Sequence, residues 1–87
     1  MHAEVALVAS SIVSLVGGAD NIAAVERCMV RLRLVLADPD VADVEAIRAL
    51  PGIALAMHLT GQLQIAPAAH LDDLYTAVSH IVAVSRA

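Results

Sequence analysis

The sequence has few aromatic residues and few basic ones. Tyr75 is the only aromatic residue among 87, so the stacking platforms that single-strand nucleic-acid binders use are missing. Five basic residues, all arginine, are outnumbered by nine acidic ones, and the net charge is −4. Binding to duplex phosphates needs a basic face. We therefore expect no nucleic-acid partner.

Cysteine is also scarce. Cys28 is the only one, which excludes an internal disulfide and a cysteine-rich zinc site, and the four histidines lack close metal-ligand spacing. We expect no metal, no cofactor and an intracellular protein. The longest apolar stretch, residues 5–18, contains three serines and is shorter than the ~20 residues that span a bilayer. Residues 1–4 carry no Lys or Arg, so no secretory signal is expected.

Apolar residues make up 60% of the chain, and their spacing predicts secondary structure throughout one domain, residues 1–87. Helices are expected at residues 3–16 before Gly17-Gly18, at 44–50 after the N-cap Asp43, and at 69–84. Strands are expected at residues 22–27, 29–36, 53–59 and 62–66. The order αββαββα predicts an α+β fold, a four-stranded antiparallel or mixed sheet with three helices on one face. Met57, in the bulky row of its strand, is expected in the core.

Three of the five arginines surround the only cysteine within seven positions: Arg27, Arg31 and Arg33. Nearby guanidinium groups favour the thiolate, which is the nucleophilic form of cysteine. Arg31 and Arg33 are two positions apart on a strand, which places them on one face and roughly 6.6 Å apart. That pair could bind a single tetrahedral dianion.

Two interpretations of this cluster stay open on the residues alone. Strict alternation puts Cys28 on the opposite face from Arg31 and Arg33, so a shared site requires Cys28 to lie at the bend of a hairpin. In the alternative, Cys28 is a buried small hydrophobe and the arginines form a solvated strand face with Glu26 as counterion.

A longer pattern contains the cluster. It consists of Gly17-Gly18-Ala19-Asp20-Asn21-Ile22, then Val25, Cys28-Met29-Val30-Arg31-Leu32-Arg33 and Asp38. This pattern resembles the signature of glucose-family enzyme IIB domains of the bacterial phosphoenolpyruvate-dependent sugar phosphotransferase system, and the similarity extends over residues 5–82. Two departures are clear, because Val30 stands at a family threonine and Ala66-Pro67 stands where glycine is usual.

The resemblance implies that Cys28 accepts a phosphoryl group from a phosphohistidine of enzyme IIA and passes it to a sugar bound by membrane enzyme IIC. Arg31 and Arg33 would then neutralise the phosphoryl oxygens. Arg27 is added to this phosphate-binding group from its charge alone, and Met29 and Val30 are expected in an apolar docking rim. The protein would be a cytoplasmic phosphotransferase component, acting as a monomer at the inner face of the membrane.

Two other functions stay open. Val30 and Ala66 favour an enzyme-IIB-like interaction or regulatory module without phosphotransfer, and the activated Cys28 favours a thiol redox sensor, although no resolving cysteine exists. His58 is expected to be a surface or edge histidine rather than a second phosphoryl acceptor. His70 and His80 lack a third metal ligand.

Overall fold

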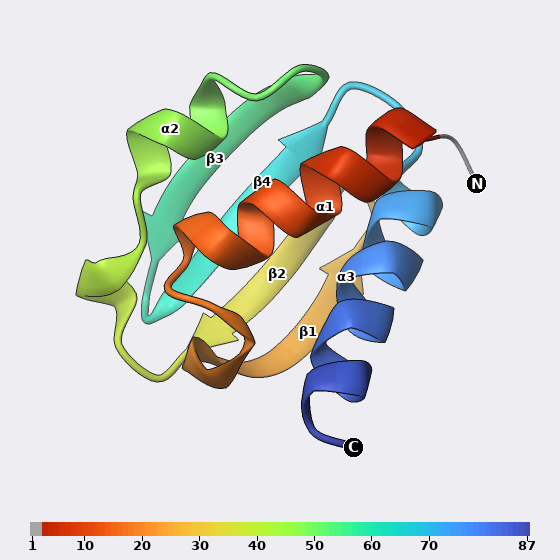
Figure 1. Ribbon diagram of the computed structural model, residues 1–87. Helices are drawn as coiled ribbons and strands as arrows, with labels where there is room; N and C mark the ends of the chain where they lie inside the picture. The colour runs from red at the N-terminus through yellow and green to blue at the C-terminus, as the bar shows by residue number, and fades with distance from the viewer. Residues whose placement is uncertain (1–2) are drawn as a thin grey trace.

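The computed structural model describes residues 3–87, which form a four-stranded sheet with three helices on one face (Figure 1). In chain order the elements are α1 (Ala3–Leu15), β1 (Ile22–Cys28), β2 (Arg31–Leu36), α2 (Val44–Arg48), β3 (Ile53–Leu59), β4 (Gln62–Pro67) and α3 (Leu71–Ser85). Short 3-10 helices, Ala19–Asn21 and Pro39–Val41, precede β1 and follow β2. The α+β prediction and the predicted element order are confirmed. Among residues 3–87, no helix combines the length and the apolar character that a membrane span requires.

The sheet has the strand order β1-β2-β4-β3, and all three pairings are antiparallel. The central strands are therefore β2 and β4, while β1 and β3 form the edges. Two-residue turns close the hairpins, Met29-Val30 between β1 and β2 and Thr60-Gly61 between β3 and β4. The expectation that Met29 and Val30 begin a strand is wrong, because Cys28 pairs with Arg31 and leaves only these two residues to reverse the chain.

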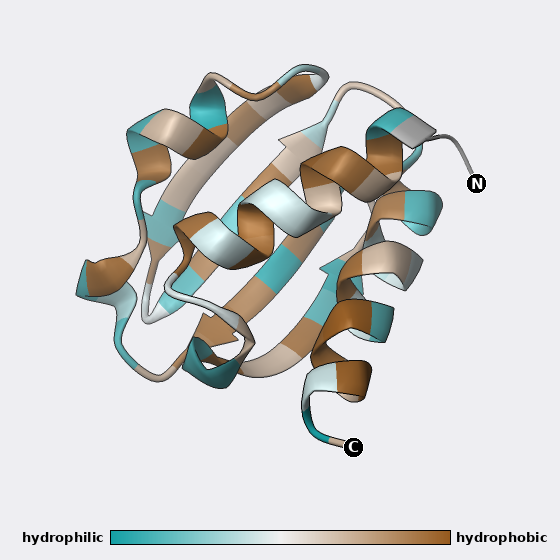
Figure 2. Cartoon of the chain, in the orientation of Figure 1, coloured by the Kyte–Doolittle hydropathy of each residue, from teal (hydrophilic) through white to brown (hydrophobic). Residues whose placement is uncertain are grey.

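The core lies between the sheet and its helices. Along β2, Leu32, Leu34 and Leu36 are buried, whereas the residues between them are half-buried. This alternation appears as brown and teal bands on the central strands (Figure 2). The rest of the core comes from both long helices, α2 and the other strands: Ala9, Ile12, Val13, Val16, Ile22, Ile47, Ala56, Leu63, Ile65, Leu74, Ala77, Val78 and Val82.

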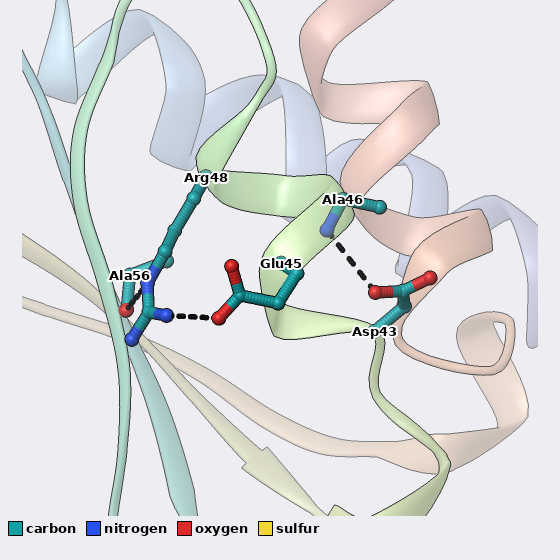
Figure 3. A network of polar contacts seen from close by, with 5 residues as sticks. All are labelled: Asp43, Glu45, Ala46, Arg48 and Ala56. Carbon is teal, nitrogen blue, oxygen red and sulfur yellow. Dashed lines mark hydrogen bonds and ion pairs between the residues drawn. The ribbon is translucent and has the colours of Figure 1, made fainter.

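Helix α2 is short and is fastened at both ends (Figure 3). As predicted, Asp43 caps its start, and the carboxylate accepts a hydrogen bond of 3.1 Å from the backbone N–H of Ala46. Near the other end, Arg48 forms an ion pair with Glu45, and its Nε donates a 2.9 Å hydrogen bond to the carbonyl oxygen of Ala56 in β3. The bond to Ala56 brings α2 close to the backbone of β3.

The prediction that Met57 belongs to the core is wrong. In β3 the small residue Ala56 is fully buried and pairs with Ile65, so the small row faces the helices. Leu55 and Met57 are half-buried on the helix-free face, where Met57 pairs with Gln64. The close approach of α2 explains this, because it leaves the helix side of β3 to a small side chain.

The end of the sheet remote from Cys28 is tied to α1 by Asn21. Its Nδ2 donates to the carbonyl oxygens of Val16 at 2.7 Å and Asp38 at 2.9 Å, and its Oδ1 accepts from the N–H of Asp38 at 2.8 Å. Gly17 has a φ of +100°, and a Cβ on it would lie 2.6 Å from Cγ1 of Val41. Gly17, Asn21 and Asp38, all part of the sequence pattern above, therefore hold the fold at this end.

Candidate functional site

Cys28 is the last residue of β1 and is exposed. Its partner across the hairpin is Arg31, the first residue of β2. Residues directly opposite each other in an antiparallel pair share a face, with Cα atoms about 4.5–5.5 Å apart. Of the two interpretations that the residues left open, the shared face is the one observed, because the chain reverses direction between Cys28 and Arg31; Cys28 itself is the last residue of β1 rather than part of the bend. The exposed thiol also contradicts the alternative in which Cys28 is a buried hydrophobe.

Arg33 lies on the same face, two residues further along β2, and its cross-strand partner is Glu26. Its Nε is buried and has no hydrogen-bond partner within residues 3–87. Buried donors in folded proteins are nearly always hydrogen-bonded. An acceptor that bound on this face would therefore satisfy the N–H of Arg33.

Arg31 is half-buried, and its guanidinium is engaged elsewhere on the sheet. Its Nη1 donates a 2.9 Å hydrogen bond to Oε1 of Gln64 in β4 and lies 3.9 Å from Sδ of Met57 in β3. Gln64 is only 3% exposed, and its Nε2 donates to Oε1 of Gln62 at 3.2 Å. Sequence reasoning gave Gln64 no role, although its place in the alternating Gln62-Leu63-Gln64 segment could have put it on a polar face.

Arg27 is not brought to this cluster. It pairs with Leu32, a core residue, and so points to the helix side of the sheet. There it forms an ion pair with Asp72 of α3 and lies 5.1 Å from the centre of the Tyr75 ring. The face that carries Cys28 therefore has two arginines, Arg31 and Arg33.

The turn beside Cys28 exposes two large apolar side chains. Met29 is 92% exposed and Val30 is 67% exposed. Met29 also has a φ of +49°, in the left-handed region, which costs a residue with a side chain on the order of 1 kcal/mol. The thiol is thus bordered by an apolar tip that packing within the domain does not explain.

The two departures from the family pattern lie at different places. Val30 is at the tip of the turn, whereas Ala66 is half-buried in β4 and pairs with Leu55 on the helix-free face. Neither displaces Cys28 or the two arginines from their shared face.

Three of the four histidines lie within residues 3–87. His58 is exposed on the edge strand β3, which confirms the expectation of a surface histidine, and His80 is exposed on α3. His70 precedes α3, with its Nδ1 3.8 Å from a carboxylate oxygen of Asp73. Within the described chain, no three His, Cys, Asp or Glu side chains come together as metal ligands.

Known proteins are similar to this chain in sequence and in fold. Residues 10–43, which contain Cys28, Arg31 and Arg33, match the family described as phosphotransferase system, EIIB. The beta-glucoside-specific EIIBCA component of Halalkalibacterium halodurans is 34% identical over 73 residues, which cover 84% of this chain and 12% of that protein. The sucrose-specific EIIBC component of Salmonella typhimurium is 41% identical over 58 residues, 67% of this chain and 13% of that protein.

The fold is similar to a solved structure as well. The crystal structure of one domain of the PTS system IIabc component from Clostridium difficile superposes with a TM-score of 0.82 at 20% identity, over 90% of this chain and 82% of that one. The chain spans only 12–13% of the length of the two curated relatives above. The sequence pattern, the sheet with its three helices and these similarities lead to one conclusion. The chain belongs to the enzyme IIB family of the phosphotransferase system.

Proposed function

We propose that this chain is a phosphoryl carrier of a sugar phosphotransferase system and that Cys28 carries the phosphoryl group. The observation that supports this most directly is the exposed thiol of Cys28 opposite Arg31, on the same face as the unpartnered Nε of Arg33. A nucleophile and two cations on one exposed face suit a reaction that needs positioning and charge neutralisation more than covalent help from the protein.

In the first step, the Cys28 thiolate attacks the phosphorus of a phosphohistidine on enzyme IIA. The S–P bond forms, the P–N bond breaks, and the imidazole leaves with the bonding electron pair. The guanidinium groups of Arg31 and Arg33 stabilise the charge on the phosphoryl oxygens through charge-assisted hydrogen bonds. The result is phosphocysteine at the end of β1.

In the second step, a hydroxyl of a sugar bound by membrane enzyme IIC attacks the same phosphorus. The S–P bond breaks, the hydroxyl proton is released to water, and the thiolate of Cys28 is regenerated beside the two arginines. The names of the relatives, EIIBC and EIIBCA, support partners of both kinds. Residues 1–87 would act as one enzyme IIB unit, monomeric, at the cytoplasmic face of the membrane.

Met29 and Val30 form the docking rim in this proposal. Apolar side chains at the centre of an interface are desolvated when a partner binds, and they contribute much of its affinity. Both partners must approach the same thiol, so both would cover this tip. Arg27, held by Asp72 on the other face, takes no part in the transfer.

The experiment is a mass measurement after incubation with phosphoenolpyruvate, the general phosphotransferase proteins and the enzyme IIA part of the beta-glucoside relative. We expect the intact protein to gain the mass of a single phosphoryl group, and Cys28→Ser to gain none. His58→Gln, a matched control at an exposed histidine, should gain the phosphoryl group as the parent does. No gain in the folded parent, as a regulatory module without phosphotransfer predicts, or a gain that persists in Cys28→Ser would overturn the proposal.

A further inference from the structure

Gln64 is a buried polar residue on a sheet face that no helix covers. It is 3% exposed, and both ends of its amide are used: Oε1 accepts from Arg31 and Nε2 donates to Gln62. Because Gln62 takes the amide nitrogen, the amide oxygen is presented to the guanidinium. The segment Gln62-Leu63-Gln64 therefore supplies an oriented acceptor for one arginine of the site.

The position of this acceptor relative to Cys28 is the informative feature. In the strand order β1-β2-β4-β3, Cys28 lies on one side of β2, and Gln64 and Met57 lie on the other. The guanidinium of Arg31 bonds to Gln64 at 2.9 Å and approaches Met57 at 3.9 Å, so it extends away from its cross-strand partner Cys28. A diagonal reach of this kind, about 7–8 Å between strands, is within the length of an arginine side chain.

We propose that Gln64 is a positioning residue that holds the guanidinium of Arg31 over β4, away from Cys28, until an anionic group that approaches or is attached to the Cys28 sulfur draws the guanidinium back. The biological meaning of this role rests on the proposed function, in which that anionic group is the phosphoryl group. The hydrogen bond that keeps the guanidinium of Arg31 at Gln64 is present in the free protein.

The difference between two acceptors, the amide of Gln64 and a phosphoryl group, explains why Arg31 can exchange one for the other. The amide oxygen of Gln64 is neutral, whereas a phosphoryl group carries negative charge and can accept two parallel hydrogen bonds from one guanidinium, which adds a Coulomb attraction of about 1 kcal/mol at about 4 Å in water. Arg31 therefore has a weaker partner in the free protein and a stronger one after phosphorylation. A carboxylate at position 64 would instead hold Arg31 in a buried ion pair.

The test compares two alkylating reagents of nearly equal size, anionic iodoacetate and neutral iodoacetamide. Cys28 is the only thiol, so intact mass reports the rate at this one site. The ratio of the two rates measures how strongly cationic groups near Cys28 favour an anion. In Gln64→Met, which keeps the length of the side chain and removes the amide, we expect this ratio to rise about fivefold at low salt, the factor that a unit charge within about 4 Å of an anion gives in water.

Further variants and a change of salt concentration test whether Arg31 causes the rise in the ratio. The rise should vanish when Gln64→Met is combined with Arg31→Met, and it should shrink at high salt, where exposed charges are screened. Leu55→Met introduces the same side chain on the helix-free face without removing a hydrogen bond to Arg31, and its ratio should stay within about 1.5-fold of the parent. An unchanged or lowered ratio in Gln64→Met, a rise that survives in the Arg31→Met background, or an equal rise in Leu55→Met would overturn the proposal.

A second measurement uses the unaltered sequence and covers the case in which Gln64→Met does not fold. We expect the side-chain amide resonances of Gln64 to move when Cys28 is carboxymethylated and to stay in place when it is carboxamidomethylated, with those of Asn21, at the far end of the sheet, unchanged in both. Equal spectra of Gln64 in the two adducts would contradict the proposal that an anionic group at Cys28 draws Arg31 away from Gln64. Neither measurement uses a phosphoryl donor, so failure of this proposal and failure of the proposed function are separate results.

Discussion

The two β-hairpins have turns of the same length and tips of opposite character. Thr60-Gly61 closes β3–β4 with φ values of +51° and +78°, and glycine is the residue that adopts such values at least cost. Met29-Val30 closes β1–β2, with Met29 at a φ of +49° and both side chains exposed. Both turns place a residue with a side chain at a positive φ, but only Met29-Val30 exposes two large apolar side chains. These exposed apolar side chains mark the tip that we propose to meet partners.

The two hairpins also differ in what they place on the helix-free face. The first supplies Cys28, Arg31 and Arg33, and the second supplies the amides of Gln62 and Gln64. Reactive and charged groups are thus concentrated in one hairpin, and the neutral acceptor that engages one of them lies in the other. On this view the second hairpin supports the chemistry of the first.

The largest effect is expected from Arg33→Ala. Removing a donor that stabilises developing charge lowers transfer rates by about 10²–10³-fold, so phosphorylation of Cys28 should slow by that factor. The measurement is the rate of phosphoryl gain by intact mass in quenched samples. Arg48→Ala, on α2 and away from the site, is the matched control and should leave the rate unchanged. A rate within about twofold of the parent for Arg33→Ala would contradict the role of this face.

Exchanging the apolar tip for the other turn should have an intermediate effect. Replacing Met29-Val30 with Thr-Gly removes exposed apolar contacts without touching Cys28, so kcat/KM for phosphorylated enzyme IIA should fall about tenfold, with a smaller change in kcat. Urea unfolding should show similar stability, because the same Thr-Gly pair closes the other hairpin with Thr60 at a φ of +51°, close to the +49° of Met29. If kcat/KM were unchanged, the two tips would be equivalent and the comparison would fail.

The smallest effect is expected at the other tip. Gly61 has a φ of +78°, and a Cβ there would contact nothing within 4 Å, so Gly61→Val introduces backbone strain without a clash. We expect the free energy of unfolding to drop by about 1 kcal/mol, measured by urea denaturation. Phosphoryl transfer by the folded protein should not change. A loss of transfer without a loss of stability would show that this tip also meets a partner.

Much of the fold could be predicted from the sequence because its signals are local. Hydrophobic periodicity gives α1, α3 and the alternation in β2 and β4, the capping carboxylate of Asp43 marks the start of α2, and Thr60-Gly61 marks a turn. The cluster of Cys28 with two arginines was also visible, since all three lie in one short segment.

The rest depends on contacts between segments distant in the sequence. That Cys28 and Arg31 share a face follows from the hairpin register, which periodicity along one strand does not contain. The position of Met57 on the helix-free face depends on how closely α2 approaches β3. The contact between Gln64 and Arg31 depends on the pairing of β2 with β4. Arg27 lies outside the cluster because it faces the helix side of the sheet, where Asp72 of α3 forms an ion pair with it.

The most direct measurement of the central claim locates the phosphoryl group within the phosphorylated protein. Cleavage after arginine releases residues 28–31, which contain Cys28, separately from residues 49–86, which contain His58, His70 and His80. Mass spectrometry of the two peptides then distinguishes the possible acceptors. The account predicts the phosphoryl group on residues 28–31, and a phosphoryl group on residues 49–86 would contradict it.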